Sequence, residues 1–188
     1  MTEVNILGLC SPQVVAKTAE DFKGEIWSLN DWYRPYPWLP KIDRLYEVHK
    51  LDKVLEQQSR GGRYKGFKKP FENMGGKIIV DDVRFIEYLD ADVELLRYDF
   101  LKNTYPLDFS CTIEIMIIEA IDKGFEKINL CGIFLLGGNH GQYIKGILKA
   151  IDYARGLGIE INTQHEDEWR EYKSTVSYYD YINMIREA

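Results

Sequence analysis

The sequence predicts a single-domain α/β protein of three layers, with a Rossmann-like fold built on a mostly parallel sheet. Short apolar segments alternate with helical segments along the 188 residues, as expected for a parallel sheet that helices cover on both faces. The chain is long enough for one domain with a sizeable core. Glycine and small polar residues follow several of the apolar segments, where a parallel sheet binds its ligands.

The composition narrows the class of protein further. Hydrophobic residues make up 45% and charged residues 29% of the chain, which is typical of soluble globular proteins. No apolar run approaches membrane-spanning length and no signal pattern begins the chain, so we expect a cytoplasmic protein without a membrane partner. The net charge of −6 argues against nucleic acid as a partner. The three cysteines have no metal-binding spacing, and we expect buried thiols.

The first predicted strand, over residues 4–7, leads into a turn that opens a helix. Gly8 ends the apolar run, and Ser11 followed by Pro12 begins the helical segment. Serine is a preferred N-cap, and proline suits the first helical position. A strand, a tight turn and a helix N-terminus leave N–H groups and the positive end of the helix dipole facing the loop, which favours phosphate binding. An ordinary βα turn without a ligand is the alternative.

The remaining helices, strands and loop of the first half are each predicted from a local sequence pattern. A short helix over 17–22 ends near a glycine, and the apolar run 25–29 is the second strand. Residues 32–40 carry three prolines and four aromatic residues, which predicts a stiff loop. The segment 44–49 alternates apolar and polar residues and is therefore the third strand. A helix over 51–59 ends at paired glycines.

The second half continues the alternation of strands and helices. Its predicted elements are a strand over 77–80, a short helix over 85–89, an extended piece over 93–97, a helix over 110–123, a strand over 127–133, a helix over 143–155 and a short strand over 159–161. The helix over 110–123 is apolar on most of its sides, which predicts a buried helix. Gly124 follows it as a natural C-cap, and Gly156 and Gly158 end the next helix.

Residues 60–70 concentrate positive charge in a chain that is acidic elsewhere. The stretch holds five cations and three glycines. We expect a basic lid loop over 59–74, in which the glycines give hinge freedom and Tyr64 and Phe67 stack on a base or seal the site. The cations that would close on a phosphate are Arg60, Arg63, Lys65 and Lys68. A solvated loop without this role is the alternative.

Small and polar residues cluster where the predicted strands end. Because the carboxyl ends of parallel strands share one edge of the sheet, we expect these residues to line a common site. The candidate nucleotide-binding residues are Gly8, Cys10, Ser11, Asn30, Asp31, Ser110, Thr112, Gly137 and Gly138. The amide of Asn30 offers one acceptor and two donors, which suits a base edge or a ribose. Capping the chain after the strand is the alternative role of Asn30.

The candidate catalytic residues are His49, His140 and Glu47. A histidine titrates near neutral pH, and Glu47 precedes His49 by two residues on the same face of the strand. His140 lies in a glycine-rich turn, where a ligand contact is expected. For His49, a hydrogen-bonded histidine at a strand end is the alternative. The dinucleotide fingerprint, the Walker lysine loop, the G-x-S-x-G elbow and metal-ligand spacings do not occur. We therefore predict no metal and no cofactor beyond a nucleotide or nucleotide-sugar that serves as substrate or ligand.

The sequence resembles a group of small Rossmann-like proteins common in bacteriophages. The matching segments are residues 8–12, 26–30, 43–49, 110–123, 124–133 and 142–143, and they cover most of residues 4–162. In outline these proteins are similar to the bacterial sialyltransferases that use CMP-sialic acid and to the archaeal pterin pyrophosphokinase-like group. The resemblance implies that Gly8 and Ser11 meet the nucleotide phosphate and that Asn30 meets the nucleoside.

Two departures from this group limit what the resemblance implies about the reaction. Gln142 stands where the phage proteins often carry Glu. The sialyltransferases carry a catalytic histidine in a lid, and His140 does not align with it. Nucleotide binding is therefore the firmer implication, and the reaction is the weaker one.

The sequence as a whole predicts binding of a nucleotide or nucleotide-sugar at the carboxyl edge of the sheet, over a single domain of residues 1–188. The predicted reaction is transfer of a glycosyl or phosphoryl group from that nucleotide, with His49 or His140 as the base. Two alternatives stay open, a non-catalytic viral protein that sequesters a nucleotide signal and a hydrolase of nucleotides or N-glycosides. The expected partner is a small-molecule nucleotide, and a homo-oligomer also stays open.

Overall fold

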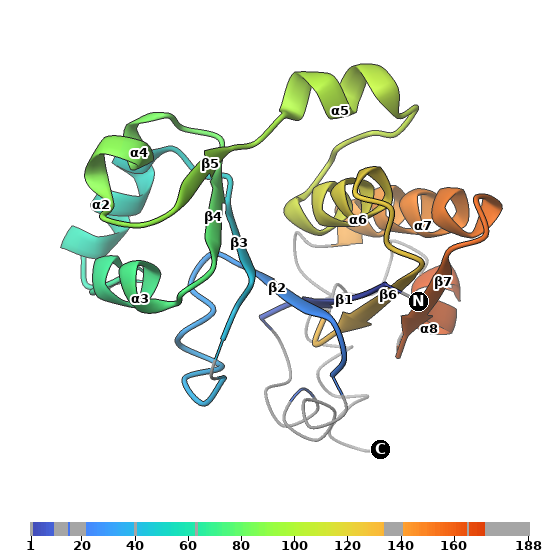
Figure 1. Ribbon diagram of the computed structural model, residues 1–188, viewed down its shortest axis with the longest axis horizontal. Coiled ribbons are helices and arrows are strands. Elements are labelled where there is room, and N and C mark those ends of the chain that lie inside the picture. The colour runs from blue at the N-terminus through green and yellow to red at the C-terminus, as the bar shows by residue number, and fades with distance from the viewer. Residues whose placement is uncertain are drawn as a thin grey trace.

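The chain folds around a parallel sheet. The structure is a computed structural model that describes residues 2–9, 15, 22–39, 41–62, 64–133, 141–164 and 166–171. The strands are β1 (Glu3–Leu7), β2 (Glu25–Leu29), β3 (Arg44–Glu47), β4 (Lys77–Val80), β5 (Val93–Leu95), β6 (Lys127–Cys131) and β7 (Glu160–Thr163). They lie in the order β5-β4-β3-β2-β1-β6-β7, and every neighbouring pair is parallel (Figure 1).

Helices cover both faces of the sheet. They are α2 (Leu51–Ser59), α3 (Lys68–Asn73), α4 (Arg84–Tyr88), α5 (Tyr98–Thr104), α6 (Thr112–Asp122), α7 (Gly141–Gly156) and α8 (Glu166–Glu171). Figure 1 shows α2, α3 and α4 grouped together, away from α6 and α7. Alternate strand residues serve the two cores, since Ile6 packs with the core under α6 and α7 and Leu7 with the core under α2 and α3. The predicted three-layer α/β fold with a parallel sheet is confirmed.

The order of the strands reverses beside β1. From β1 to β5 each strand adds on the same side of the one before it, whereas β6 returns to pair with the other edge of β1. A doubly wound sheet leaves a crevice at such a point, beyond the carboxyl ends of its strands. Gly8 lies there, and its N–H donates to the carbonyl of Cys131, the last residue of β6, over 2.8 Å.

Helix α6 is buried on almost every side, as predicted. Every residue from 113 to 121 is buried, including two glutamates. The helix begins at Thr112, with Cys111 as its N-cap, rather than at Ser110 as predicted. The reason is that the Ser110 hydroxyl donates to Oε2 of Glu114 over 2.8 Å and is not used to cap the helix.

Several predicted boundaries differ from the structure. Strand β3 ends at Glu47 and β6 at Cys131, so both are shorter than predicted. Helices α3 and α5 were not expected. In α3, Pro70 is the third residue of the helix, and proline is tolerated in a first turn because its missing N–H has no intrahelical partner there. The predicted helix over 17–22 lies almost entirely outside the described residues.

Two of the three cysteines lie in the described part of the chain, where buried thiols were expected. Cys111 and Cys131 carry free thiols, and burial raises the pKa of each to about 11. Both therefore stay protonated at neutral pH and are poor nucleophiles. Cys10 lies outside the described residues.

None of the described helices combines the length and the apolar character that crossing a membrane requires.

Candidate functional site

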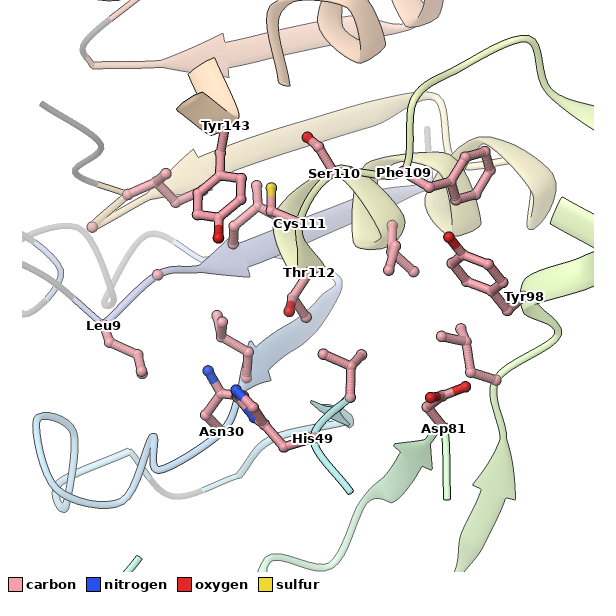
Figure 2. Close-up of a pocket in the computed structure, with 18 residues that line it drawn as sticks. Leu9, Asn30, His49, Asp81, Tyr98, Phe109, Ser110, Cys111, Thr112 and Tyr143 are labelled. Carbon is pink, nitrogen blue, oxygen red and sulfur yellow. The ribbon is translucent and has the colours of Figure 1, made fainter. Parts of the chain in front are cut away.

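A cavity of about 760 Å³ opens beyond the carboxyl ends of the strands, beside the start of α6 (Figure 2). Small-molecule sites have volumes of roughly 300–1,000 Å³. The strand ends contribute Gly8, Asn30, His49, Asp81 and Gly132 to its lining, and residues 109–113 form the wall at α6. The predicted site residues Gly8, Asn30, His49, Ser110 and Thr112 therefore meet in one cavity.

The first turn of α6 faces this cavity without a capping side chain. The N-cap residue Cys111 makes no side-chain hydrogen bond to the helix. Thr112 and Ile113, the first two helical residues, both line the cavity. The first N–H groups of a helix lack intrahelical partners, and the helix dipole places partial positive charge there. This end of the cavity is therefore suited to an anion such as a phosphate.

Asn30 brings a buried and unpaired acceptor to the same cavity. It follows β2 in a left-handed backbone conformation with φ of 50°, fixed by its N–H, which donates to the carbonyl of Tyr46 over 3.0 Å. Only 5% of Asn30 is exposed, and its Oδ1 has no hydrogen-bond partner among the described residues. An unpaired buried acceptor is unfavourable, which makes Asn30 a candidate contact for a ligand in this cavity. The next residue, Asp31, pairs with Arg34 at 3.5 Å instead and is not part of this lining.

Gly8 has a packing reason to be glycine besides its place in the site. A Cβ at this position would lie 2.5 Å from the carbonyl oxygen of Gly132 and 2.9 Å from Cα of Ile133. The carbonyl of Gly8 also accepts a hydrogen bond from the hydroxyl of Tyr36. Strands β1 and β6 can therefore approach this closely only with glycine at position 8. Contact between Gly8 and a phosphate stays a prediction.

His49 is held by the buried carboxylate of Glu47. Oε1 of Glu47 lies 2.6 Å from Nδ1 of His49 and accepts the His49 backbone N–H over 2.9 Å. A carboxylate only accepts, so Nδ1 carries the proton and Nε2 is left to accept one. The hydroxyl of Tyr64 lies 3.1 Å from Nδ1 and adds a second contact. With Glu47 fully buried and the His49 side chain 25% exposed, the arrangement orients an imidazole that a ligand can reach.

A further part of the cavity lining is aromatic and carries one carboxylate. Tyr98 and Phe109 form an edge-to-face pair with ring centroids 5.6 Å apart. Figure 2 shows the Asp81 carboxylate and the Tyr98 hydroxyl directed toward the cavity. Asp81 also accepts a hydrogen bond from Nζ of Lys50 over 2.7 Å, which leaves its other oxygen available. Among the described lining residues, Asp81 is the only carboxylate, and no lysine or arginine is present.

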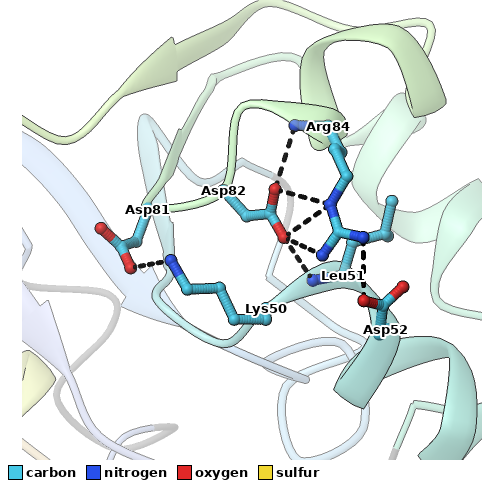
Figure 3. Close-up of polar contacts among 6 residues, drawn as sticks. All are labelled: Lys50, Leu51, Asp52, Asp81, Asp82 and Arg84. Atoms are coloured by element: carbon cyan, nitrogen blue, oxygen red, sulfur yellow. Dashed lines mark hydrogen bonds and ion pairs between the residues drawn. The ribbon is translucent and has the colours of Figure 1, made fainter.

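A second carboxylate, Asp82, secures the turn that carries His49 (Figure 3). It accepts the N–H of Leu51, the first residue of α2, over 2.9 Å and Nη2 of Arg84 over 2.7 Å. Arg84 also donates to Asp52 over 2.8 Å. The Arg84 guanidinium holds the pKa of Asp82 well below its usual range. This network ties the start of α2 to the end of β4, and so fixes the segment after His49.

The sequence reasoning did not single out Asp82, Glu114 or Tyr98. Asp82 was detectable as part of an acidic pair directly after a strand, two residues before an arginine. Glu114 had the position of a capping-box glutamate, the third residue of a helix. Nothing local identified Tyr98, because it reaches the cavity only through the path of the chain after β5.

None of the described residues of the predicted lid lines the cavity, although the Tyr64 hydroxyl contacts His49, which does. Arg60 pairs with Glu56 at 2.6 Å. Lys68 pairs with Glu72 at 3.6 Å and lies 4.8 Å from the ring centre of Tyr88, and Lys65 is exposed. Tyr64 and Phe67 are fully buried in the core under α2 and α3 rather than presented to a ligand. Closure of this segment over a nucleotide stays a prediction.

Several predicted site residues fall outside the described part of the chain. They are Cys10, Ser11, Arg63, Gly137, Gly138 and His140. Of the three predicted catalytic residues, the structure describes His49 and Glu47, whereas His140 lies outside the described residues.

Comparison with known proteins identifies solved structures of similar fold. No protein-family model matches the sequence, and no curated protein matches it. A structure of the sialyltransferase CstII from Campylobacter jejuni with the substrate analogue cytidine-5'-monophosphate shares 18% identity and a TM-score of 0.55, covering 86% of this chain and 78% of that one. The same enzyme with CMP-3FNeuAc gives a TM-score of 0.54 at 18% identity, over 86% and 79% of the two chains.

A further structure of this sialyltransferase, with a trisaccharide acceptor and CMP, has 15% identity and a TM-score of 0.51, over 85% of this chain and 79% of that one. At these identities the similarity establishes a shared fold. The sialyltransferase part of the resemblance therefore holds at the level of fold, whereas no match supports the phage or pterin pyrophosphokinase-like groups.

Proposed function

We propose that this protein binds a nucleotide or nucleotide-sugar in the cavity at the carboxyl edge of the sheet and transfers a group from it to an acceptor. The observation that carries the proposal is the convergence of three features on one cavity. These are the uncapped start of α6, the unpaired Oδ1 of Asn30 and the imidazole of His49 held by Glu47. Solved structures of the same fold that hold CMP or CMP-3FNeuAc support it.

The two ends of a nucleotide have complementary groups in the cavity. The phosphate faces the N–H groups of Thr112 and Ile113 and the turn at Gly8. The nucleoside offers an N–H or O–H donor to Asn30 Oδ1, which has no other partner among the described residues. With no lysine or arginine in the described lining, main-chain N–H groups and the dipole of α6 balance the phosphate charge.

The chemistry we propose is glycosyl transfer with His49 as general base. Nε2 of His49 takes the proton of an acceptor hydroxyl, whose oxygen forms a bond to the sugar carbon. The bond from that carbon to the phosphate oxygen breaks, and its electron pair leaves with the nucleotide. Glu47 stabilises the imidazolium that forms, since its buried carboxylate contacts Nδ1. The end of the cavity formed by Asp81 and Tyr98 is available to the acceptor.

Mass spectrometry of small molecules that accompany the natively purified protein is the first test of this proposal. We expect a nucleotide or nucleotide-sugar in the bound fraction. The purified protein is then incubated with a CMP-linked sugar, with and without a saccharide acceptor. Release of CMP only with acceptor supports transfer, and release without it indicates a hydrolase. Binding without release indicates a sequestering protein, and the absence of any bound or binding nucleotide contradicts the proposal.

A further inference from the structure

Glu114 is a fully buried carboxylate at the third position of α6, among residues 109–113 and their neighbours at the cavity wall. Its Oε1 accepts the backbone N–H groups of Asp108 and Phe109 over 3.1 and 2.9 Å. Its Oε2 accepts the N–H and the hydroxyl of Ser110 over 2.6 and 2.8 Å. All four donors belong to residues 108–110, the loop that leads into α6. One buried side chain thus satisfies most of the donors of that loop.

This hydrogen bonding differs from ordinary helix capping. A glutamate at the third helical position commonly bonds to the N–H of the N-cap residue. Glu114 has that position, yet it reaches past the N-cap Cys111 to the loop before it. Phe109 within this loop adopts φ of 55°, a conformation that is unfavourable for an aromatic residue and needs support from its surroundings. Glu114 therefore holds the loop that leads into α6, whose first two residues, Thr112 and Ile113, line the cavity.

Gly146 extends the same cluster to α7. A Cβ on Gly146 would lie 2.3 Å from Oγ of Ser110 and 2.6 Å from Oε2 of Glu114. Glycine within a helix is less stable than alanine, so this close approach accounts for its presence. Tyr143, three residues earlier on α7, lines the cavity. The cluster thus joins two walls of the cavity, the start of α6 and the start of α7.

We infer that Glu114 is a positioning residue for phosphate recognition, and that Gly146 provides the room it needs. The inference rests on the proposed function, because it assumes that the ligand carries a phosphate at the start of α6. Glu114 does not touch that ligand, since it is fully buried. Its carboxylate sets the loop whose conformation directs the N–H groups of Thr112 and Ile113 into the cavity. Loss of the network should weaken the phosphate contribution to binding and leave the nucleoside contribution intact.

The test compares CMP with cytidine in titrations of Glu114→Gln followed by nuclear magnetic resonance, which measures weak binding as well. The variant keeps the shape of the side chain but turns an NH₂ group toward N–H donors. We expect CMP affinity to fall by about tenfold or more, with cytidine affinity unchanged. Gly146→Ala should act in the same direction, because its Cβ displaces Ser110 and Glu114. A merely structural role would not change the ratio of the two affinities.

Matched controls come from the same two helices. Glu119 of α6 is also buried, but it faces Arg44 at 3.6 Å and Lys123 at 3.5 Å. Glu119→Gln should keep the wild-type ratio of CMP to cytidine affinity. Gly156 at the end of α7 has nothing near its missing Cβ, so Gly156→Ala should also keep it. An unchanged ratio in both Glu114→Gln and Gly146→Ala would overturn the inference and leave the proposed function intact.

Amide hydrogen exchange separates failure of this inference from failure of the proposed function. If wild-type protein binds neither CMP nor cytidine, nucleotide binding of this kind is contradicted, and exchange then tests the inference without ligand. We expect faster exchange at the amides of Asp108, Phe109 and Ser110 in Glu114→Gln than in wild type. Exchange that stays as slow as in wild type would overturn the positioning role of Glu114.

Discussion

The Nδ1 atom of His49 lies 2.6 Å from Oε1 of Glu47, and the Glu47 side chain has no exposed surface. The pair joins the last residue of β3 to the second residue after the strand, and the backbone N–H of His49 also donates to Oε1 of Glu47 over 2.9 Å. A buried carboxylate in this place orients the imidazole. The second oxygen, Oε2, has no partner among the described residues.

We expect His49→Asn to abolish most of the transfer activity while keeping nucleotide binding. General-base catalysis contributes about 10²–10⁴-fold to a rate, so CMP release from a CMP-linked sugar in the presence of acceptor should fall by that factor. Calorimetric titration with CMP should give an affinity near that of wild type. Wild-type turnover in His49→Asn would exclude it as the base, and His140 would then be the remaining candidate of the two histidines.

Asn30→Gly should weaken nucleotide binding without destabilising the fold. Glycine adopts the left-handed conformation of residue 30 at no steric cost, so only the amide is removed. We expect affinity to fall by about tenfold, the value of one hydrogen bond to a buried acceptor, with the thermal midpoint kept or raised. Asn30→Ala is the control that adds strain at φ of 50°, and it should be less stable than Asn30→Gly. An Asn30→Gly protein that binds as tightly as wild type would show that Oδ1 does not meet the ligand.

Much of the fold could be predicted from the sequence because its signals are local. Alternation identified β3, and the apolar surface of residues 113–121 identified α6 as buried. Helix α5 carried no such signal, since it is short and only Leu101 is buried along it. The start of α6 was predicted wrongly because Ser110 resembles an N-cap, whereas its hydroxyl is used by Glu114. That contact depends on the direction of the buried Glu114 side chain in the folded protein, which no sequence pattern predicts.

The candidate site could be predicted only in part for a similar reason. Asn30 and His49 follow strands, and parallel strands bring their carboxyl ends to one edge. The basic segment was predicted to be a lid from its charge, its glycines and its two aromatic residues, but Tyr64 and Phe67 are core residues. Their burial depends on the packing of α2 and α3, which the charge of the segment does not predict. Asp81 and Tyr98 join the site through the order of strands β4 and β5, which is a property of the whole sheet.

The Asp82 network should make part of the stability depend on pH. The pKa of Asp82 in the folded protein is depressed by Arg84, whereas an unfolded aspartate has a pKa of about 3.9. Its contribution is therefore complete above that value and is lost as pH falls toward the folded pKa. We expect Asp82→Asn to lower the free energy of unfolding by about 1–3 kcal/mol at pH 7. This difference from wild type should shrink as pH is lowered from about 6 to about 3.

Denaturant unfolding at several pH values measures this difference. Asp92→Asn is the matched control, because the Asp92 side chain is 70% exposed and lies 3.9 Å from Lys77. An exposed ion pair contributes only about 0–1 kcal/mol, so the control should differ little from wild type at any pH. A difference between Asp82→Asn and wild type that grows on acidification would show that the sign of the effect is wrong.

Limited proteolysis tests the predicted lid. If residues 59–74 close over a nucleotide, trypsin should cut after Arg60, Lys65 or Lys68 in the free protein, and saturating CMP should protect these sites. Cleavage at Lys102, at the end of α5 and outside the segment, serves as the internal reference. The burial of Tyr64 and Phe67 anchors the segment on either side of Gly66, so any closure is confined to the exposed cations. Equal rates of cutting with and without CMP would leave the segment as a surface connection.

The position of the bound nucleotide is the most direct test of the proposed binding site. Isotope-labelled wild-type protein is titrated in turn with CMP, UMP, AMP and GMP, and the amide resonances are followed by nuclear magnetic resonance. We predict that at least one nucleotide shifts Thr112 and Ile113 at the start of α6 together with Gly8 and Asn30, and leaves Glu119 at the far end of α6 unchanged. Saturable shifts confined to other surfaces, or no shift with any of the four nucleotides, would contradict it.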